Sequence, residues 1–158
     1  LNFGLHIRGA ESALDRQGVQ ALLASQFEVR PGLGARFARL YDSLFAVDWG
    51  VAGTFSRVAV VNGEVVGHAL LAQRQFWVDG TEFTGGIVAM VVVHGEFTGR
   101  GIGTALMEDV EALARRKGLL MLHLAGDPGF YTRFGYVDAY LRCSAALPAL
   151  SAPKSIYD

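Results

Sequence analysis

Apolar residues recur along this chain at two spacings, and the changes between them divide it into predicted elements. Residues 11–27 and 33–45 carry apolar side chains every three or four positions, which predicts two helices. Residues 58–93 are instead rich in β-branched and apolar residues, which is typical of strands. Helical spacing returns over 103–117, the clearest amphipathic pattern in the chain, and a strand is expected over 119–125.

Short turn signals set the boundaries of these elements. Asn62-Gly63 and Asp79-Gly80 favour two-residue hairpin turns, because both positions tolerate positive φ. Gly18 weakens the first helical pattern and is a point at which that helix would divide. The turns leave a meander of antiparallel strands at 58–61, 65–71, 73–78, 81–83 and 87–93. The remaining expected elements are a first strand at 5–8, a short helix at 128–134 and a further strand at 136–145.

The order of these elements predicts one α/β domain over residues 1–158. A strand, two helices and an antiparallel meander come first, and a β-α-β-α-β series follows. Such an order indicates a central mixed, mostly antiparallel sheet flanked by helices. A length of 158 residues fits a single domain with one hydrophobic core.

Composition and charge narrow the range of partners. The formal net charge is -1, and no basic excess points to nucleic acid or to an anionic membrane. Cys143 is the single cysteine, which leaves no internal disulfide framework and no cysteine-based zinc site, and we expect no metal. We also expect a cytoplasmic protein, because no apolar run has the length of a membrane span and the first residues lack a secretion-signal pattern.

A glycine-rich turn after the strand at 87–93 carries the most information about chemistry. Thr98-Gly99-Arg100-Gly101-Ile102-Gly103 lies between that strand and the helix at 103–117. The first N–H groups of a helix have no internal partner and lie at the positive end of its dipole, so they bind anions. Glycine permits the positive φ and the close backbone approach of a phosphate cradle. The first turn, Thr104 and Ala105, has no acidic side chain, which fits an anionic ligand.

Other interpretations of such a loop have their own sequence requirements. A Walker A loop needs a Gly-Lys pair, and the chain has none. A dinucleotide fingerprint needs Gly-x-Gly-x-x-Gly, but its last position falls on Thr104 or Leu106 from the two available starts. An ordinary tight turn explains a short Gly-x-Gly equally well when the loop is considered alone.

Residues 99–106, which follow an apolar strand, resemble the acetyl-CoA loop of the GNAT superfamily of N-acetyltransferases. The family motif is Gln/Arg-x-x-Gly-x-Gly/Ala. Its glycines are present as Gly101 and Gly103, and Thr98 stands where Gln or Arg is usual. Downstream, Phe130-Tyr131-Thr132-Arg133-Phe134-Gly135-Tyr136 looks like the family's Tyr-x-x-x-Gly-Phe segment. One helix and one strand separate the two motifs, as they do in the family.

This resemblance implies an acetyl-CoA-dependent N-acetyltransferase that transfers the acetyl group directly to a primary amine of a small molecule or a peptide. Such proteins are commonly dimers, which leaves a homodimer open. A non-catalytic domain that binds or senses acyl-CoA is the alternative function. A weaker resemblance, to the aminoglycoside 2'-N-acetyltransferases, lies in residues 63–80, with His68 and Gln73-Arg74-Gln75, and in Asp48-Trp49.

The resemblance also implies which residues hold acetyl-CoA. The strand end at Val91–Val93 would pair with the pantetheine arm as an added strand, and the N–H groups of the loop would hold the pyrophosphate. The residues assigned to the cofactor are Val91, Val92, Val93, Thr98, Gly99, Arg100, Gly101, Ile102, Gly103 and Thr104.

Acyl transfer needs a proton for the departing thiolate, and the motif position of Tyr131 implies this role. A tyrosine packed for its ring is the structural alternative. No ionisable side chain occurs in 87–93, where such enzymes often carry a glutamate, so a remote base acting through water, or no base, is expected. His123 is the candidate base, because alternation puts it on the sheet face opposite Leu122, with a core histidine as the alternative.

Several other residues have both a functional and a structural interpretation. His68 is expected in the core, like most histidines on an apolar strand face. Asp127 would either bind a cationic amine or cap the short helix. Four aromatic residues would either wall an acceptor pocket or pack in the core and hairpins: Trp49, Phe76, Trp77 and Phe83.

Overall fold

The structure is a computed structural model that describes residues 4–46 and 54–139. The chain forms two compact units, Leu1–Ala125 and Gly126–Asp158. Of the described residues, the first unit contains the sheet and three long helices, and the second contains a short helical segment. Trp49, Cys143 and residues 140–145 of the last expected strand lie outside the described residues.

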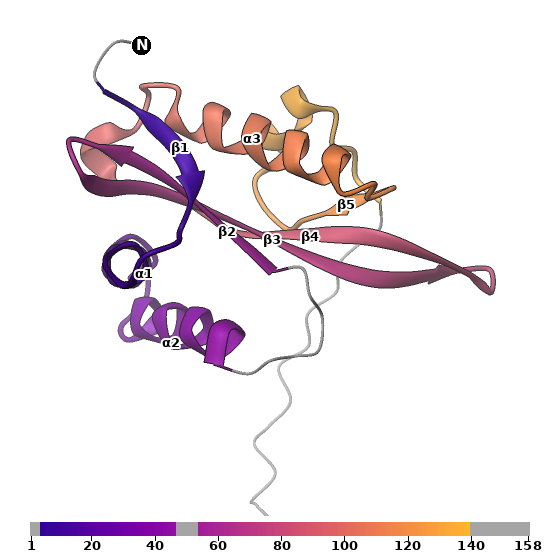
Figure 1. The fold of residues 1–158 in the computed structure, drawn as a ribbon, viewed down its shortest axis with the longest axis horizontal. Helices are drawn as coiled ribbons and strands as arrows, with labels where there is room; N and C mark the ends of the chain where they lie inside the picture. The colour runs from indigo at the N-terminus through magenta and orange to yellow at the C-terminus, as the bar shows by residue number, and fades with distance from the viewer. Residues whose placement is uncertain (1–3, 47–53, 140–158) are drawn as a thin grey trace, which may run out of the picture. The chain divides into compact units, whose positions relative to one another are not determined.

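Five strands of the first unit form one sheet in the order β1-β2-β3-β4-β5 (Figure 1). The strands are β1 His6–Gly9, β2 Thr54–Val61, β3 Glu64–Val78, β4 Thr81–Val93 and β5 Leu122–His123. Neighbouring strands are antiparallel except β4 and β5, which are parallel. The predicted mixed, mostly antiparallel sheet is therefore confirmed.

The backbone confirms both predicted hairpin turns. φ is +50° at Asn62 and +85° at Gly63, and it is +48° at Asp79 and +77° at Gly80. Positive φ at both central residues is what a two-residue turn of this kind requires, because it matches the twist of the flanking strands.

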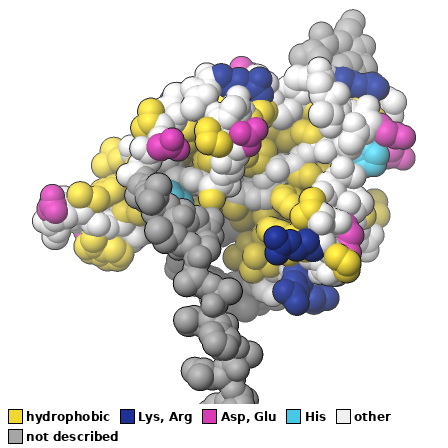
Figure 2. Space-filling model, turned by 180° about the vertical axis from the view of Figure 1, so that it is seen from behind, with side chains coloured by type: hydrophobic (Ala, Val, Ile, Leu, Met, Phe, Trp, Pro, Cys, Tyr) yellow, Lys and Arg dark blue, Asp and Glu magenta, His cyan; other side chains and the backbone are white. Residues whose placement is uncertain are grey.

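The β3–β4 hairpin is longer than the sequence predicts. The expected breaks near 72 and at 84–86 are wrong, because β3 and β4 stay paired along nearly their whole length. Phe76 and Phe83 stack across the hairpin with ring centroids 5.7 Å apart, which stabilises its outer part. Figure 2 shows hydrophobic side chains gathered on this projecting end, where Trp77 remains 64% exposed.

Helices cover both faces of the sheet in the first unit (Figure 1). α1 Ala13–Gln26 and α2 Leu33–Ala46 lie on one face, and α3 Ile102–Arg116 lies on the other. The core beneath α1 and α2 is built on Val19, Leu23, Tyr41, Val58, Val60, Leu70 and Met90. The buried stripe of α3 is made of residues at most 1% exposed: Ile102, Leu106, Met107 and Val110.

Gly18 does not divide the first helix, contrary to the expectation from the sequence. α1 is continuous, and it brings position 18 directly over β3. A Cβ atom at Gly18 would lie 2.9 Å from the Cβ of Val65, so glycine allows the helix to approach the sheet closely. This packing offsets the low helix propensity of glycine.

The second unit contains α4 Pro128–Tyr131, which continues into a single 3-10 turn, η2 Thr132–Phe134. The predicted short helix at 128–134 is therefore confirmed as a helical segment. Asp127 caps it, because its Oδ1 accepts the N–H of Gly129 at 3.0 Å. Residues 136–139 form no strand, since they have no ladder partner among the described strands.

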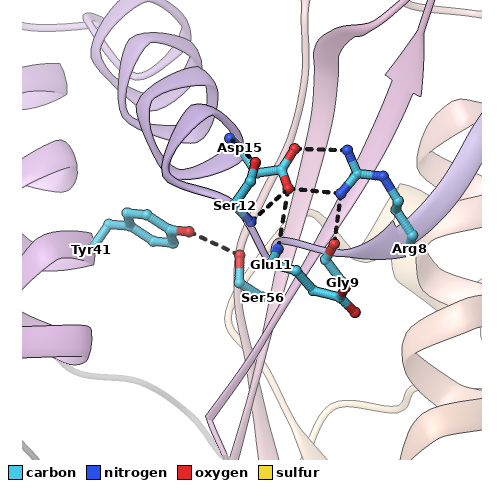
Figure 3. A network of polar contacts seen from close by, with 7 residues as sticks. All are labelled: Arg8, Gly9, Glu11, Ser12, Asp15, Tyr41 and Ser56. Atoms are coloured by element: carbon cyan, nitrogen blue, oxygen red, sulfur yellow. Dashed lines mark hydrogen bonds and ion pairs between the residues drawn. The ribbon is translucent and has the colours of Figure 1, made fainter.

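A buried carboxylate joins β1 to α1 (Figure 3). Asp15 is 5% exposed and accepts bonds from Nη1 and Nη2 of Arg8, at 2.7 and 2.8 Å. It also accepts the N–H groups of Glu11 and Ser12, while Ser12 Oγ caps α1 by accepting the N–H of Asp15. The bonds from Arg8, ahead of those from Ser12, hold the pKa of the Asp15 carboxyl far below its usual range.

The low pKa of Asp15 makes part of the stability depend on pH. Because the folded chain favours the ionised carboxyl, this stabilisation is present above about pH 4, the unfolded pKa, and is lost as the pH falls toward the folded pKa. We expect Asp15→Asn to lower the free energy of unfolding by about 2 kcal/mol at pH 7, with the difference narrowing below pH 4.

Urea unfolding of wild type and Asp15→Asn across this pH range measures that difference. Glu64→Gln removes an exposed carboxylate of β3 and serves as the matched control, with little effect at any pH. A difference for Asp15→Asn that is the same at pH 7 and pH 3 would contradict the assignment.

Candidate functional site

Over its last residues, the outer edge of β4 has no partner among the described strands, and we call this stretch the open edge. β5 pairs with β4 only at Gly86 and Ile87, and no other described strand follows β4 on that side. The strand expected at 119–125 is thus shortened to Leu122–His123, because the chain leaves β4 after these two pairs. The outward backbone groups of Val91–Val93 therefore have no ladder partner among the described strands.

Backbone hydrogen bonds show which residues face this open edge. The Gly86 N–H donates to the carbonyl just before β5 at 2.8 Å, so Gly86 faces outward. The His94 N–H donates to the Val66 carbonyl of β3, also at 2.8 Å, so His94 faces inward. Since inward and outward residues alternate along a strand, Val91 and Val93 present both N–H and C=O to the open edge.

A β-bulge near the end of β4 makes this arrangement possible. The ladder with β3 shifts by one residue there, so that Met90 and Val91 lie opposite a single residue of β3. Met90 has φ +51°, in the left-handed region that few residues other than glycine adopt. The inserted residue changes the outward positions from even numbers, as at Gly86, to odd numbers, at Val91 and Val93.

His68 contacts the bulge from β3 and is completely buried. Its Nδ1 lies 2.9 Å from the Met90 carbonyl, which only accepts, so Nδ1 carries the proton. Its Nε2 lies 3.1 Å from Ser56 Oγ, and Ser56 Oγ lies 3.0 Å from the hydroxyl of Tyr41. Burial lowers the pKa of His68 to about 4, so the ring is neutral at pH 7 and Nε2 accepts. The expected core position of His68 is confirmed.

After β4 the chain turns through η1 Gly95–Phe97 into the loop that opens α3. Gly99 and Gly101 have φ of +77° and +80°, which glycine adopts without strain. Gly101 is the N-cap of α3 without a capping side chain, and the first turn has no acidic residue. The Ala105 N–H makes the first intrahelical bond, to the Gly101 carbonyl at 3.0 Å, so the N–H groups of 102–104 precede that ladder.

These N–H groups lie at the positive end of the α3 dipole. Arg100 is exposed in the same loop, and its guanidinium carbon lies 5.1 Å from the ring centroid of Phe97. The Thr98 N–H is used within the turn, where it donates to the Gly95 carbonyl at 3.2 Å. An anion would therefore be held by the N–H groups that follow Thr98, beside the charge of Arg100.

Close packing fixes the start of α3 against the sheet. A Cβ atom at Gly67 would lie 3.0 Å from Leu106 Cδ1, so glycine lets α3 approach β3 closely. Gly67 also pairs with Val93, and it thereby links the beginning of the helix to the open edge of β4. Farther along α3, a half-buried two-bond ion pair joins Asp109 to Arg57 of β2, at 2.5 and 2.9 Å.

Tyr131 lies in the second unit, at the end of α4. A Cβ atom at Gly126 would lie 2.2 Å from Tyr131 Cε2, so only glycine leaves room for the ring. Phe130 and Tyr136 make edge contacts with it, with centroids 4.9 and 6.1 Å away. Burial, and to a lesser degree the charge of Asp127, raise the pKa of the phenol, so it stays protonated at neutral pH and can donate.

The structure places the sequence-based candidates in separate parts of the chain. Val91–Val93 and the loop at 98–104 follow one another in the first unit. His123 is also in the first unit, half-buried in β5 opposite Ile87. Tyr131 belongs to the second unit. Their roles in acetyl transfer remain predictions.

The structure shows the structural role of Asp127 and of two of the hairpin aromatic residues. Asp127 acts as the cap of α4, as described above. Phe76 and Phe83 pack on each other within the hairpin, whereas Trp77 is exposed beside them.

Two residues that shape the candidate site cannot be identified from the sequence. Met90 gives no hint of its positive φ, because methionine has no preference for that conformation. Gly126 stands ahead of the Tyr131 motif, where it looks like any turn glycine, and only the packing shows that it accommodates the ring.

No group of three or more His, Cys, Asp or Glu side chains that could hold a metal ion occurs in the part of the chain that the structure describes. None of the helices in that same part has both the length and the apolar character needed to cross a membrane.

Comparison with known proteins identifies one family. A protein-family model described as acetyltransferase (GNAT) family matches residues 19–136 of this chain. A GNAT family acetyltransferase from Brucella melitensis, solved in complex with acetyl-CoA, is 27% identical over 93% of each chain, with a TM-score of 0.73. An acetyltransferase from Trypanosoma brucei is 25% identical over 90% of this chain and 99% of its own, with a TM-score of 0.68.

A more distant structure shares the fold. Glucosamine-6-phosphate N-acetyltransferase from Arabidopsis thaliana is 18% identical over 91% of this chain and 99% of its own, with a TM-score of 0.68. A search of curated protein sequences gives no match.

The raised pKa of Tyr131 can be tested by titration. We expect Asp127→Asn to lower this pKa, because it removes a negative charge that disfavours the phenolate while asparagine can still cap α4. Burial, the larger cause, remains, so the pKa should stay above that of an ordinary tyrosine. NMR titration of isotope-labelled tyrosine, assigned with Tyr131→Phe, measures both values. A pKa that rises in Asp127→Asn would contradict this account.

Proposed function

Because this chain belongs to the acetyltransferase (GNAT) family, we propose that it transfers an acetyl group from acetyl-CoA directly to a primary amine of a small molecule or a peptide. One observation carries the proposal: the open edge of β4 at Val91–Val93 leads, within one unit, into the uncapped start of α3. The two features follow one another along the chain as the pantetheine arm and the pyrophosphate do in coenzyme A.

The chemistry of each feature fits the corresponding part of acetyl-CoA. The outward N–H and C=O groups of Val91 and Val93 would pair with the amides of the pantetheine arm, as an added strand pairs with a sheet edge. The N–H groups of residues 99–104, with the charge of Arg100, would hold the pyrophosphate. The Brucella melitensis relative, which was solved in complex with acetyl-CoA, supports acetyl-CoA as the cosubstrate.

In the transfer step, the neutral amine attacks the thioester carbon as the C–S bond breaks, and the amine loses one proton. An outward N–H group near Val93 would stabilise the negative charge that develops on the carbonyl oxygen. Tyr131 would give its phenolic proton to the departing thiolate, and its raised pKa keeps that proton in place beforehand. His123, or water, would take the proton of the amine. The products are an acetylated amine and free coenzyme A.

The family match reaches from the first compact unit into the second. This supports the proposal of one functional domain over residues 1–158.

A binding domain without turnover is the second candidate function. It is favoured by the lack of any ionisable side chain in 87–93 and by Thr98 at the position of the usual Gln or Arg. Thiol release from acetyl-CoA, measured across a broad panel of amines, separates the two candidates. Release with one amine supports the transferase, and tight binding without release for any amine supports the binding domain.

The loop assignment predicts the effect of one charge. Acetyl-CoA should raise the Tm of the wild-type protein, because only the folded loop binds it. Gly101→Glu should abolish this rise, since it adds a negative charge and a side chain at a cradle position with φ +80°. Thermal unfolding with and without acetyl-CoA measures the effect.

Gly80→Glu is the matched control for this substitution. Gly80 has φ +77°, a Cβ there would meet no atom within 4 Å, and it lies at the far end of β4 from the loop. The control carries the same charge and similar backbone strain, so it should lose intrinsic stability but keep the full ligand shift. A full shift in folded Gly101→Glu would disprove the loop assignment.

The role of Tyr131 predicts a defect in rate without a defect in binding. Tyr131→Phe keeps the ring against Gly126 and removes only the hydroxyl. With an amine that is turned over, kcat should fall roughly ten- to a thousandfold. Affinity for coenzyme A should change little, because the hydroxyl acts once the thiolate develops. An unchanged kcat would refute the proton-donor role, and loss of both folding and binding would show that Tyr131 only packs.

A further inference from the structure

The bulge in β4 has a strained residue at its centre. Met90 is 8% exposed, packs in the core with α1 and α2, and has φ +51°. A left-handed φ costs free energy for any residue with a Cβ atom, and glycine would avoid that cost. Such strain persists only where the surroundings enforce it, and it is concentrated at functional sites.

The restraint on Met90 comes from a buried chain of hydrogen bonds. The Tyr41 hydroxyl donates to Ser56 Oγ at 3.0 Å, a bond drawn in Figure 3. The Ser56 hydroxyl donates to His68 Nε2 at 3.1 Å, and His68 Nδ1–H donates to the Met90 carbonyl at 2.9 Å. Tyr41 also packs edge-on against the imidazole, with centroids 5.3 Å apart. The chain fixes the His68 ring, and the ring fixes the Met90 carbonyl.

The position of the bulge determines which residues reach the open edge. Before it, even-numbered residues such as Gly86 face outward, and after it Val91 and Val93 do. In a regular strand without the inserted residue, Val92 would face outward and its two neighbours would face β3. The Met90 conformation is therefore what exposes the backbone groups of Val91 and Val93.

We propose that His68 is a positioning residue for acetyl transfer, which holds the Met90 carbonyl through Nδ1–H and so keeps Val91 and Val93 turned toward acetyl-CoA. The inference rests on the proposed function, because it gives these two residues their ligand. His68 lies in the core and acts only through the backbone of β4.

Two substitutions separate this role from simple packing. An asparagine at position 68 places its amide nitrogen near the position of Nδ1, where it can donate to the Met90 carbonyl. A glutamine places its amide near the position of Nε2, where it reaches Ser56 instead. Glutamine is closer to histidine in volume, so a packing role predicts that His68→Gln is tolerated better. A positioning role predicts the opposite: His68→Asn should keep the bulge and ligand binding better than His68→Gln does.

Amide hydrogen exchange without ligand tests the bulge itself. In wild type and His68→Asn, the inward N–H groups of Val92 and His94 should exchange slowly, and those of Val91 and Val93 fast. In His68→Gln, exchange at Val92 should be faster by about tenfold or more, because the hydrogen bond to the Met90 carbonyl is lost. If folded His68→Gln shows the same pattern as wild type, with slow exchange at Val92 and His94 and fast exchange at Val91 and Val93, the proposal is overturned.

Calorimetric titration with coenzyme A tests the consequence for binding. His68→Gln should raise the dissociation constant by about tenfold or more, whereas His68→Asn should stay within about threefold of wild type. Ser56→Ala is the comparison within the same chain, since it removes the partner of Nε2 but leaves Nδ1–H in place, and it should weaken binding less than His68→Gln does. Wild-type affinity in His68→Gln would overturn the positioning role.

The remaining outcomes are also decisive. If the wild-type protein does not bind coenzyme A, the proposed function fails, and with it the role of His68 in transfer, while the exchange pattern still decides whether His68 holds the bulge. If neither His68 variant folds, nitrogen NMR of the labelled wild-type imidazole gives the tautomer. A proton on Nδ1 supports the proposal, and a proton on Nε2 alone would overturn it.

Discussion

Backbone N–H and C=O groups need partners, and this requirement organises the whole candidate site. Most of the sheet meets it through neighbouring strands, and α3 meets it through its own ladder. Among the described groups without such a partner are two stretches that lie close in sequence: the outer edge of β4 beyond Ile87, and the first turn of α3. They are joined by a loop whose glycines adopt positive φ. In the proposed function, a ligand with amides along one arm and a diphosphate at its end would supply partners to both stretches.

The rest of the fold holds these two stretches in place. The residue that pairs with Val93 in the ladder, Gly67, also lets α3 approach the sheet closely. The other sheet face is covered by α1 and α2, and its core contains Met90 at the centre of the bulge. Thus one face of the sheet fixes the start of the helix, and the other fixes the conformation of the strand edge. The candidate site depends on the packing of both layers, although the groups proposed to bind the ligand are backbone atoms.

The parts of the fold that sequence predicts well are those set by local chemistry. Asn62-Gly63 and Asp79-Gly80 form hairpins because positive φ is a property of these residues themselves, and the loop before α3 is recognisable by glycines and missing acids. The failures have nonlocal causes. Local pattern places Gly86 outside a strand, yet a Cβ atom there would lie 2.7 Å from Leu122 and 2.8 Å from Leu71, so the glycine serves sheet packing. Likewise, nothing in the local sequence marks Met90 as left-handed, because its restraint comes from His68 on another strand.

The same reasoning explains why the family and its cosubstrate are accessible from the sequence while the acceptor is not. Backbone donors can be recognised in a sequence only by glycines and by the absence of acidic residues in the first turn of a helix. These two features indicate a ligand with the shape and charge of a diphosphate. An amine acceptor must instead be selected by side chains, because backbone groups on a β edge do not distinguish one amine from another. The strand segment 87–93 contributes no ionisable side chain to such a choice. Charged groups that select the acceptor must therefore come from outside this segment, where the sequence shows no motif comparable to the glycine loop.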